Sequence, residues 1–418
     1  MAQSVLHRDP RVDFFRGAAF IIILIAHIPS NWVAQWIPAR FGFSDATEMF
    51  VFMSGFAAGI AFGGTYRTAG FWLGTARIYF RAWQVYVANL LLFFFVLVLM
   101  LAANAWLYAD TDYVTQLALN YFLDDTGRAL LGLFSMTYVP NFFDILPMYI
   151  VVLLMVPVFM ALSRIHPLAG YAGCLVLYAA NYVFIFELPA EVSPDRDFRA
   201  WFFNPFAWQL LFFTGFAMSM GYLKLPRFRW WLAALCLALI AVGVVYSRYG
   251  LWSWSDTLSD LRGQLVDLRC QNWRGDGADR CYFWTKSNLD VVRILHFLAI
   301  AYLVVWALKG HERVLTMGWA QPILQCGRQS LPVFMFSMIL SRVYNVLMDQ
   351  TERTTWEEIA FNVVAVANLI AIAYLLGWLK SNPWRPHKPA RTPAPEAQGQ
   401  AQGGARWGNA VPAPGSAE

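Results

Sequence analysis

Arg16 and His27 are the residues in this sequence whose types and spacing most strongly suggest chemistry, and both lie in one apolar run that begins at Asp13. They are eleven positions apart, which on a helix of about 100° per residue places them on one face, about 16 Å apart. Ionisable residues inside a membrane helix are costly and usually functional. Because histidine can take a proton from a hydroxyl that attacks a carbonyl carbon, we predict that His27 is a general base.

Two carboxylates near the start of the second apolar run, Asp45 and Glu48, are expected to act on His27. A neighbouring carboxylate fixes the tautomer of an imidazole and favours its protonated form. We therefore predict catalytic roles for Asp45 or Glu48 in orienting His27. The alternative is a histidine that packs between helices and bonds to a nearby carbonyl.

Three arginines are predicted to gather at one membrane surface. Arg77 and Arg81 are four residues apart, so they share a helix face at the inner end of a third apolar run. Arg16 is expected near the same surface. Guanidinium groups at the mouth of a bundle suit phosphates, such as those of coenzyme A. Snorkelling arginines that only set the topology are the alternative.

Other polar residues lie inside or beside apolar runs and together suggest a polar passage through the bundle. Arg293 and His296 are three apart on one helix face. Asp144 begins another run, where a role in helix capping is the alternative. We predict that the following five residues bind substrate: Asp144, Gln209, Arg293, His296 and Arg328.

The composition is that of an integral membrane protein. The chain has 418 residues, of which 59% are hydrophobic and 14% charged, and its mean hydropathy is +0.47. A net charge of +5 is too small and dispersed to indicate a nucleic-acid partner. We predict an all-α polytopic bundle of about ten transmembrane helices, with spans at 13–34, 44–64, 82–104, 144–162, 168–187, 201–222, 230–247, 289–308, 320–344 and 357–379.

The charge pattern of the loops predicts that both termini are cytoplasmic. Lys and Arg gather in segments such as 224–229, whereas Asp and Glu gather in 110–125 and 187–197. The domain organisation is then a cytoplasmic N-terminus at 1–12, a membrane domain at 13–380 with a periplasmic loop near 248–288, and a disordered cytoplasmic tail at 381–418. No internal repeat is found, which counts against the inverted-repeat transporters.

Two of the five cysteines, Cys270 and Cys281, bracket a polar segment of the loop near 248–288. In an oxidising compartment such a pair is expected to form a disulfide, and a pair of free thiols is the alternative. No Cys or His spacing suits a metal, so no metal is predicted.

Several longer strings carry a resemblance to a known family. Arg16 and His27, followed by the string Glu48 to Phe56, resemble the first two helices of the acyltransferase-3 superfamily. The fuller strings resemble the OpgC family: Asp13-Phe-Phe-Arg-Gly17, Phe41-Gly-Phe-Ser-Asp-Ala46, Arg81-Ala-Trp-Gln-Val-Tyr86, Asp144-Ile-Leu-Pro147, Asn204-Pro-Phe-Ala-Trp-Gln209 and Gly327-Arg-Gln-Ser-Leu-Pro332. These proteins are inner-membrane enzymes that succinylate osmoregulated periplasmic glucans.

The resemblance implies roles at matching positions. His27 corresponds to the essential histidine of the superfamily and Arg16 to its partner cation. Arg77 and Arg81 fall at the third-helix arginines, which would bind acyl-CoA, and Glu48 matches the acidic position of the second helix. Acyl-CoA, either succinyl-CoA or acetyl-CoA, is then a co-substrate, with no bound cofactor.

The function expected from this resemblance is O-acyl transfer, most simply succinyl transfer, to periplasmic glucan by a multi-pass protein of the bacterial inner membrane, surrounded by lipids. Arg293 is the expected partner of the succinyl carboxylate. The alternatives are the same chemistry on lipopolysaccharide or another envelope glycan, and a proton-coupled transporter, which would move solute without consuming an acyl donor.

Overall fold

The computed structural model describes residues 9–107, 111–184, 186–191, 199–247, 255–269 and 285–384, except for the side chains of 262 and 265–269. Within these ranges the regular structure is helical apart from a short antiparallel pair, β1 (Pro189–Glu191) and β2 (Arg199–Ala200). The chain divides into two units, Met1–Lys380 and Ser381–Glu418. The predicted tail falls in the second unit, of which 381–384 are described.

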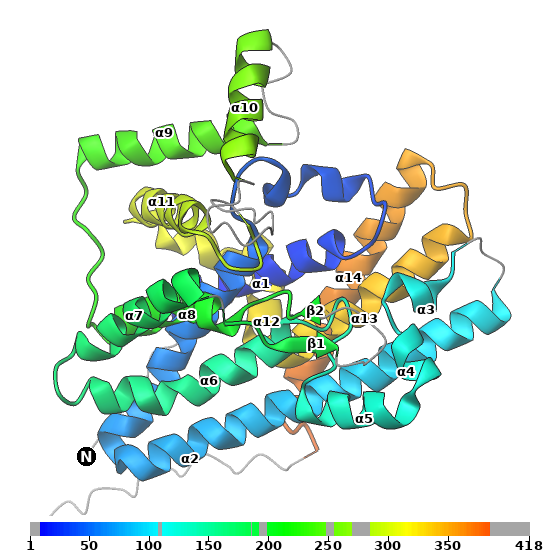
Figure 1. Cartoon of the computed structure of the whole chain (residues 1–418), viewed down its shortest axis with the longest axis horizontal. Coiled ribbons are helices and arrows are strands. Elements are labelled where there is room, and N and C mark those ends of the chain that lie inside the picture. Colours follow the sequence, from blue (N-terminus) through cyan, green and yellow to red (C-terminus); the bar gives the residue numbers. More distant parts are fainter. Residues whose placement is uncertain are drawn as a thin grey trace, which may run out of the picture. The chain divides into compact units, whose positions relative to one another are not determined.

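The helices follow one another through the first unit (Figure 1). The α-helices are α1 (Pro10–Ala26), α2 (Ala46–Trp106), α3 (Tyr113–Gln116), α4 (Asn120–Asp124), α5 (Thr126–Ser135), α6 (Ile145–Leu162), α7 (Ala169–Phe184), α8 (Pro205–Ser219), α9 (Trp230–Tyr246), α10 (Asp256–Arg269), α11 (Val291–Leu308), α12 (Gln321–Arg328), α13 (Ser330–Asp349) and α14 (Thr355–Lys380). Short 3₁₀ helices are η1 (Val33–Trp36), η2 (Pro38–Arg40), η4 (Glu312–Thr316) and η5 (Gly318–Ala320).

Five of the described helices are long and apolar enough to cross a membrane: α2, α6, α11, α13 and α14. Helices α7 and α9 are apolar but shorter. The prediction of a helical membrane protein is therefore confirmed. The number of ten spans and the cytoplasmic placement of both termini remain predictions.

Helix α2 is a helical hairpin. It is 61 residues long, and Gly70, with φ 82°, interrupts its helical backbone. A straight helix of that length would extend about 90 Å, far beyond a hydrocarbon core of about 30 Å. The two arms are joined by contacts across the bend, such as the 3.0 Å hydrogen bond between the hydroxyls of Tyr66 and Thr75. The helix therefore contains both predicted spans, 44–64 and 82–104.

Helix α1 ends earlier than predicted, and this sets the position of His27. The helix stops at Ala26, and His27 is its C-cap with φ −95° and ψ 1°. Pro29 disfavours helical backbone at Ile28 and cannot donate a backbone hydrogen bond, which explains the early end. His27 therefore lies at the end of α1 and not within a span that continues to residue 34.

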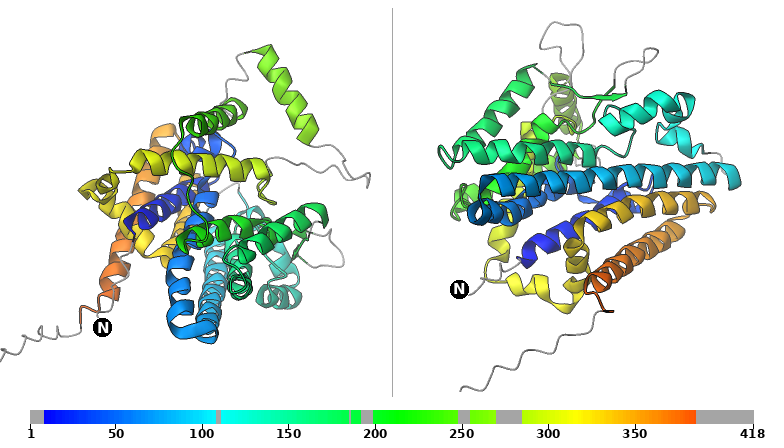
Figure 2. Two further views of the ribbon diagram at one scale, coloured as in Figure 1. Left: turned by 90° about the vertical axis from the view of Figure 1, so that its left-hand side faces the viewer. Right: turned by 90° about the horizontal axis from the view of Figure 1, so that it is seen from below.

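The C-terminal part of the chain also departs from the predicted spans. The region predicted as one span at 320–344 forms two helices, α12 and α13, which separate at Gln329. Helix α13 then packs against α14, and the two lie side by side in Figure 2. Helix α1 packs against α2, α12 and α13, so the N-terminal helix is enclosed by the elements that could line a site.

Candidate active site

A cavity of about 540 Å³ lies among α1, α2, α12, α13 and α14 and gathers four cationic side chains. These are Arg16, Arg81, Arg328 and Lys380. Small side chains of α2 form another part of the wall: Ser54, Ala57, Ala58 and Ala61. Several cations suit a ligand that carries phosphates, and a wall of small side chains leaves room for a slender arm attached to them. We refer to this space as the cationic cavity.

Two glycines set the close helix crossing that places Arg16 near Arg328. A Cβ atom on Gly17 would lie 1.9 Å from the carbonyl oxygen of Ile323, and one on Gly327 would lie 1.7 Å from that of Asp13. The backbones of α1 and α12 therefore touch, as small residues allow in membrane bundles. Because each arginine adjoins one of these glycines in sequence, the crossing directs both toward the cationic cavity.

The structure thus brings together arginines that were predicted in two separate groups. Arg16 and Arg81 were predicted to bind acyl-CoA, and both line the cationic cavity. Arg328 was predicted to bind substrate and lines the same cavity, where it also lies 4.0 Å from the carboxylate of Asp13. Lys380 was not predicted, because a lysine at the end of an apolar helix is also explained by membrane topology.

Arg77 is not among the residues that line the cationic cavity. Its guanidinium donates a 3.0 Å hydrogen bond to the carbonyl oxygen of Ala61 and another to the hydroxyl of Thr65. It also lies 5.5 Å from the ring centroid of Phe62, a residue of the cavity wall. In this structure Arg77 therefore ties the two arms of α2 together behind that wall.

The ring of His27 has a defined tautomer at the other end of α1. Its Nδ1 lies 2.7 Å from the carbonyl oxygen of Ile23. Because a carbonyl can only accept, Nδ1 must carry the hydrogen in this bond. The neutral imidazole then keeps its lone pair on Nε2, which is the atom able to accept a proton from a hydroxyl.

His27 is next to an aromatic ring and a buried cation. The imidazole meets the ring of Phe142 edge-on, with centroids 5.2 Å apart. The guanidinium of Arg342 lies 4.2 Å from the centroid of the same ring and donates a hydrogen bond to the carbonyl oxygen of His27. Sequence reasoning missed Arg342, although a charged residue inside the apolar stretch of α13 was the signal for it.

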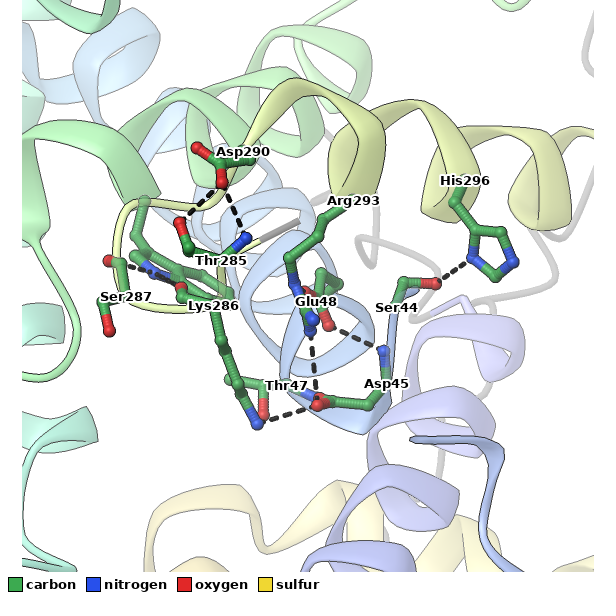
Figure 3. A network of polar contacts seen from close by, with 11 residues as sticks. Ser44, Asp45, Thr47, Glu48, Thr285, Lys286, Ser287, Asp290, Arg293 and His296 are labelled. Carbon is green, nitrogen blue, oxygen red and sulfur yellow. Dashed lines mark hydrogen bonds and ion pairs between the residues drawn. The ribbon is translucent and has the colours of Figure 1, made fainter. Parts of the chain in front are cut away.

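Asp45 and Glu48 belong to a buried ionic network at the start of α2 (Figure 3). They form a capping box: Asp45 accepts from the backbone N–H of Thr47 at 2.7 Å, and Glu48 accepts from that of Asp45 at 2.8 Å. Arg293 of α11 donates to Glu48 at 2.7 Å and lies 3.4 Å from Asp45. The ammonium of Lys286 lies 2.7 Å from Asp45. Two carboxylates thus balance two cations.

These contacts bear on two expectations, which both remain predictions. Among the described hydrogen bonds and ion pairs, neither Asp45 nor Glu48 contacts the imidazole of His27, which the carbonyl of Ile23 orients instead. Arg293 is already paired with both carboxylates, so binding a succinyl carboxylate would require it to leave a buried ion pair. Removing one partner of such a pair typically costs about 3–5 kcal/mol.

A second cavity, of about 300 Å³, includes Asp144. It is named the outer cavity after the predicted topology, which would place it on the periplasmic side. Its lining residues are Asn141, Asp144, Glu187, Leu188, Arg199, Ala200, Trp201, Phe202, Asn204, Ser287 and Asn288. Asp144 accepts from the backbone N–H of Phe202 at 3.3 Å, and Arg199 donates to Asn141 at 2.7 Å. Aromatic rings among planar polar groups suit a polyhydroxylated ligand, which presents both C–H faces and hydroxyls.

The outer cavity is connected to His27 through one loop. Asn141 and Asp144 line the cavity, and Phe142 between them contacts His27 and Arg342. A ligand in the outer cavity would therefore be bound by the same short segment that touches His27.

A family model described as OpgC protein matches residues 8–381, which is most of the 418 residues. The chain belongs to the OpgC family. Membership indicates a transferase and, together with the apolar helices, a membrane acyltransferase. No curated protein and no solved structure matches the chain.

Two further residues predicted to bind substrate have other contacts in this OpgC family member. His296 lies 2.7 Å from the hydroxyl of Ser44 through Nδ1 and is buried beside Gly42 and Gly243, so it secures the segment that precedes α2. Gln209 is fully buried and donates to the carbonyl of Cys174 at 2.9 Å, which joins α8 to α7. Gln209 lines neither the cationic nor the outer cavity.

Some cysteines of this OpgC family member lie among the described residues and others lie outside them. Cys270 and Cys281 lie outside the described residues, so their disulfide remains a prediction. The described thiols, Cys174, Cys236 and Cys326, are reduced and buried. In the described ranges no three His, Cys, Asp or Glu side chains come together as metal ligands.

Proposed function

We propose that this protein is an integral-membrane O-acyltransferase that moves a succinyl group from cytoplasmic succinyl-CoA to a hydroxyl of a periplasmic glucan. The observation that carries the proposal is the arrangement along α1. One end of this helix contributes Arg16 to the cationic cavity. The other end holds His27 with Nδ1 bonded to the Ile23 carbonyl, so that Nε2 is available as a base.

The cationic cavity supports the donor part of the proposal. Coenzyme A carries a pyrophosphate and a 3′-phosphate, and Arg16, Arg81, Arg328 and Lys380 provide positive charge for them. The pantetheine arm would lie along the small side chains of α2. Arg16 and His27 are about 16 Å apart along the helix axis, roughly the reach of such an extended arm. The thioester would then arrive near His27.

The proposed reaction requires no metal or redox step. Nε2 of His27 accepts the proton of a sugar hydroxyl while the oxygen attacks the thioester carbonyl carbon. The tetrahedral intermediate collapses with cleavage of the C–S bond, and the departing sulfur takes the proton from the imidazolium. One ester forms, one thioester is lost and coenzyme A leaves as the thiol.

The outer cavity supports the acceptor part. Trp201 and Phe202 offer aromatic faces, and Asn141, Asp144 and Arg199 offer polar groups to sugar hydroxyls. Under the predicted topology, with the N-terminus inside and ten spans, these residues face the periplasm. The protein would then be a multi-pass protein of the inner membrane that links a cytoplasmic donor to a periplasmic acceptor.

The test uses purified protein, succinyl-CoA and neutral glucan, with release of coenzyme A and negative charge on the glucan as readouts. Wild type should produce both. His27→Ala should lower kcat by about 10²–10⁴-fold, and His311→Ala, which removes an exposed histidine, should not. Coenzyme A release without acylated glucan would redirect the search to lipopolysaccharide or another glycan. A protein inert with succinyl-CoA and acetyl-CoA alike, in which His27→Ala abolishes a solute flux, would be a transporter.

A further inference from the structure

Arg342 is a buried cation without an acidic partner among the described residues. Its side chain is on α13, and the residue is 3% exposed. Two other arginines with little exposure are paired: Arg293 with Glu48 at 2.6 Å, and Arg353 with Asp349. No ion pair of Arg342 is found among the described residues. Its Nε atom is buried and has no hydrogen-bond partner among those residues either.

The position of Arg342 relates it directly to the general base. It donates a hydrogen bond to the carbonyl oxygen of His27. Its guanidinium carbon lies 4.2 Å from the ring centroid of Phe142, and the imidazole centroid of His27 lies 5.2 Å from the same ring centroid. Any group that reacts at His27 therefore comes close to this cation.

The backbone of Phe142 is an independent sign that this arrangement serves a ligand. Its φ is 88°, which is unfavourable for a bulky side chain and in folded proteins is concentrated at functional sites. The strained residue places its ring against both Arg342 and His27. Residues on either side of it, Asn141 and Asp144, line the outer cavity.

A buried, uncompensated cation is costly and is stabilised when an anion binds beside it. The phosphates of the donor would lie at the other end of α1, near Arg16. A succinyl group, unlike an acetyl group, brings its own carboxylate to the thioester end. Arg293, the cation first expected to meet that carboxylate, is occupied by Glu48 and Asp45. Arg342 is not.

We propose that Arg342 binds the free carboxylate of a dicarboxylic acyl donor and thereby makes the enzyme prefer succinyl over acetyl groups. This inference rests on the proposed acyl transfer and adds the residue that selects the donor. Arg342 is a specificity residue in this scheme, and His27 remains the base. A guanidinium suits this role because it stays charged when buried and directs N–H donors at a carboxylate.

Selectivity, and not activity alone, tests the proposal. Non-hydrolysable thioether analogues of succinyl-CoA and acetyl-CoA are titrated calorimetrically into wild type, Arg342→Gln and Arg342→Lys. Glutamine can still donate to the carbonyl of His27 but is neutral. Wild type should bind the succinyl analogue about 10- to 100-fold more tightly than the acetyl analogue. Arg342→Gln should lose this preference, and Arg342→Lys should retain part of it.

Arg353→Gln is the matched control, because it removes an arginine that is already paired with Asp349, and it should leave the preference unchanged. An equal loss of affinity for both analogues in Arg342→Gln would overturn the proposal, since it would indicate a general role at the thioester. Equal binding of both analogues by wild type would overturn it even if no variant folds. Succinyl transfer with unchanged selectivity in Arg342→Gln would remove Arg342 while leaving the proposed function in place.

Discussion

Arg293 donates a 2.7 Å hydrogen bond from Nε to the carboxylate of Glu48, 245 positions earlier in the chain. Glu48 is fully buried, and the pair joins the start of α11 to the start of α2 (Figure 3). A bond between elements so distant in sequence makes the first two helices depend on the C-terminal half of the bundle. We therefore interpret this pair as a structural support for the site.

Breaking the pair should destabilise the protein more than neutralising both partners. Glu48→Ala leaves the guanidinium of Arg293 with only the more distant Asp45 carboxylate, at 3.4 Å, and should cost about 3–5 kcal/mol. The double variant Glu48→Gln with Arg293→Gln should recover part of this loss. Thermal unfolding in detergent measures the difference, and a double variant no more stable than Glu48→Ala would contradict the interpretation.

The cationic cavity should control the affinity for the donor. Arg16→Ala, Arg81→Ala and Arg328→Ala should each raise KM for succinyl-CoA by about 10-fold or more, because each loses a charged contact to phosphate. KM for glucan should not change. Arg67→Ala is the control, since Arg67 is exposed and does not line the cavity. Unchanged donor kinetics in Arg16→Ala would remove this residue from the donor site.

Dephospho-coenzyme A thioesters refine this prediction. A donor without the 3′-phosphate should bind wild type more weakly than the complete donor does. One of the three arginines is expected to contact this phosphate, and the variant that lacks that arginine should bind the dephospho donor about as well as wild type does. If all three arginine variants lose as much affinity for the dephospho donor as for the complete one, none of them contacts the 3′-phosphate.

The outer cavity should control the affinity for the acceptor. Phe202 is 47% exposed and lines this cavity, so Phe202→Ala should raise KM for glucan and leave KM for acyl-CoA unchanged. Phe134→Ala is the matched control because Phe134 is 53% exposed on α5 and is not part of the cavity lining. A change in donor KM with constant glucan KM would place the acceptor elsewhere.

Cys270 and Cys281 should be oxidised to each other if their loop faces the periplasm. Protein isolated without reductant should then resist alkylation at both positions, and reduction should expose two further thiols. Cys236 provides an internal reference, because it is a described free thiol. Complete alkylation of both residues before reduction would contradict either the bond or the placement of the loop.

The sequence by itself determined the class of fold and the positions of Arg16 and His27 near the two ends of one helix. In a membrane, the backbone N–H and C=O groups of a long apolar run find their hydrogen-bond partners when the run is helical. Helices α6, α7 and α9 accordingly begin and end within a few residues of their predicted spans. The spacing of Arg16 and His27 follows from helix geometry alone. The family also follows from sequence, because its strings are local.

The tertiary structure decided which of these polar groups meet. Arg328 joins Arg16 because Gly17 and Gly327 let two backbones touch, and Glu48 meets Arg293 from a distant helix. Helices that are apolar on every side carry little information about which face meets which neighbour, since lipid and protein are similar surroundings for such side chains. Partner choice therefore depends on close packing and on the pairing of buried charges, as the contact between Arg342 and His27 illustrates.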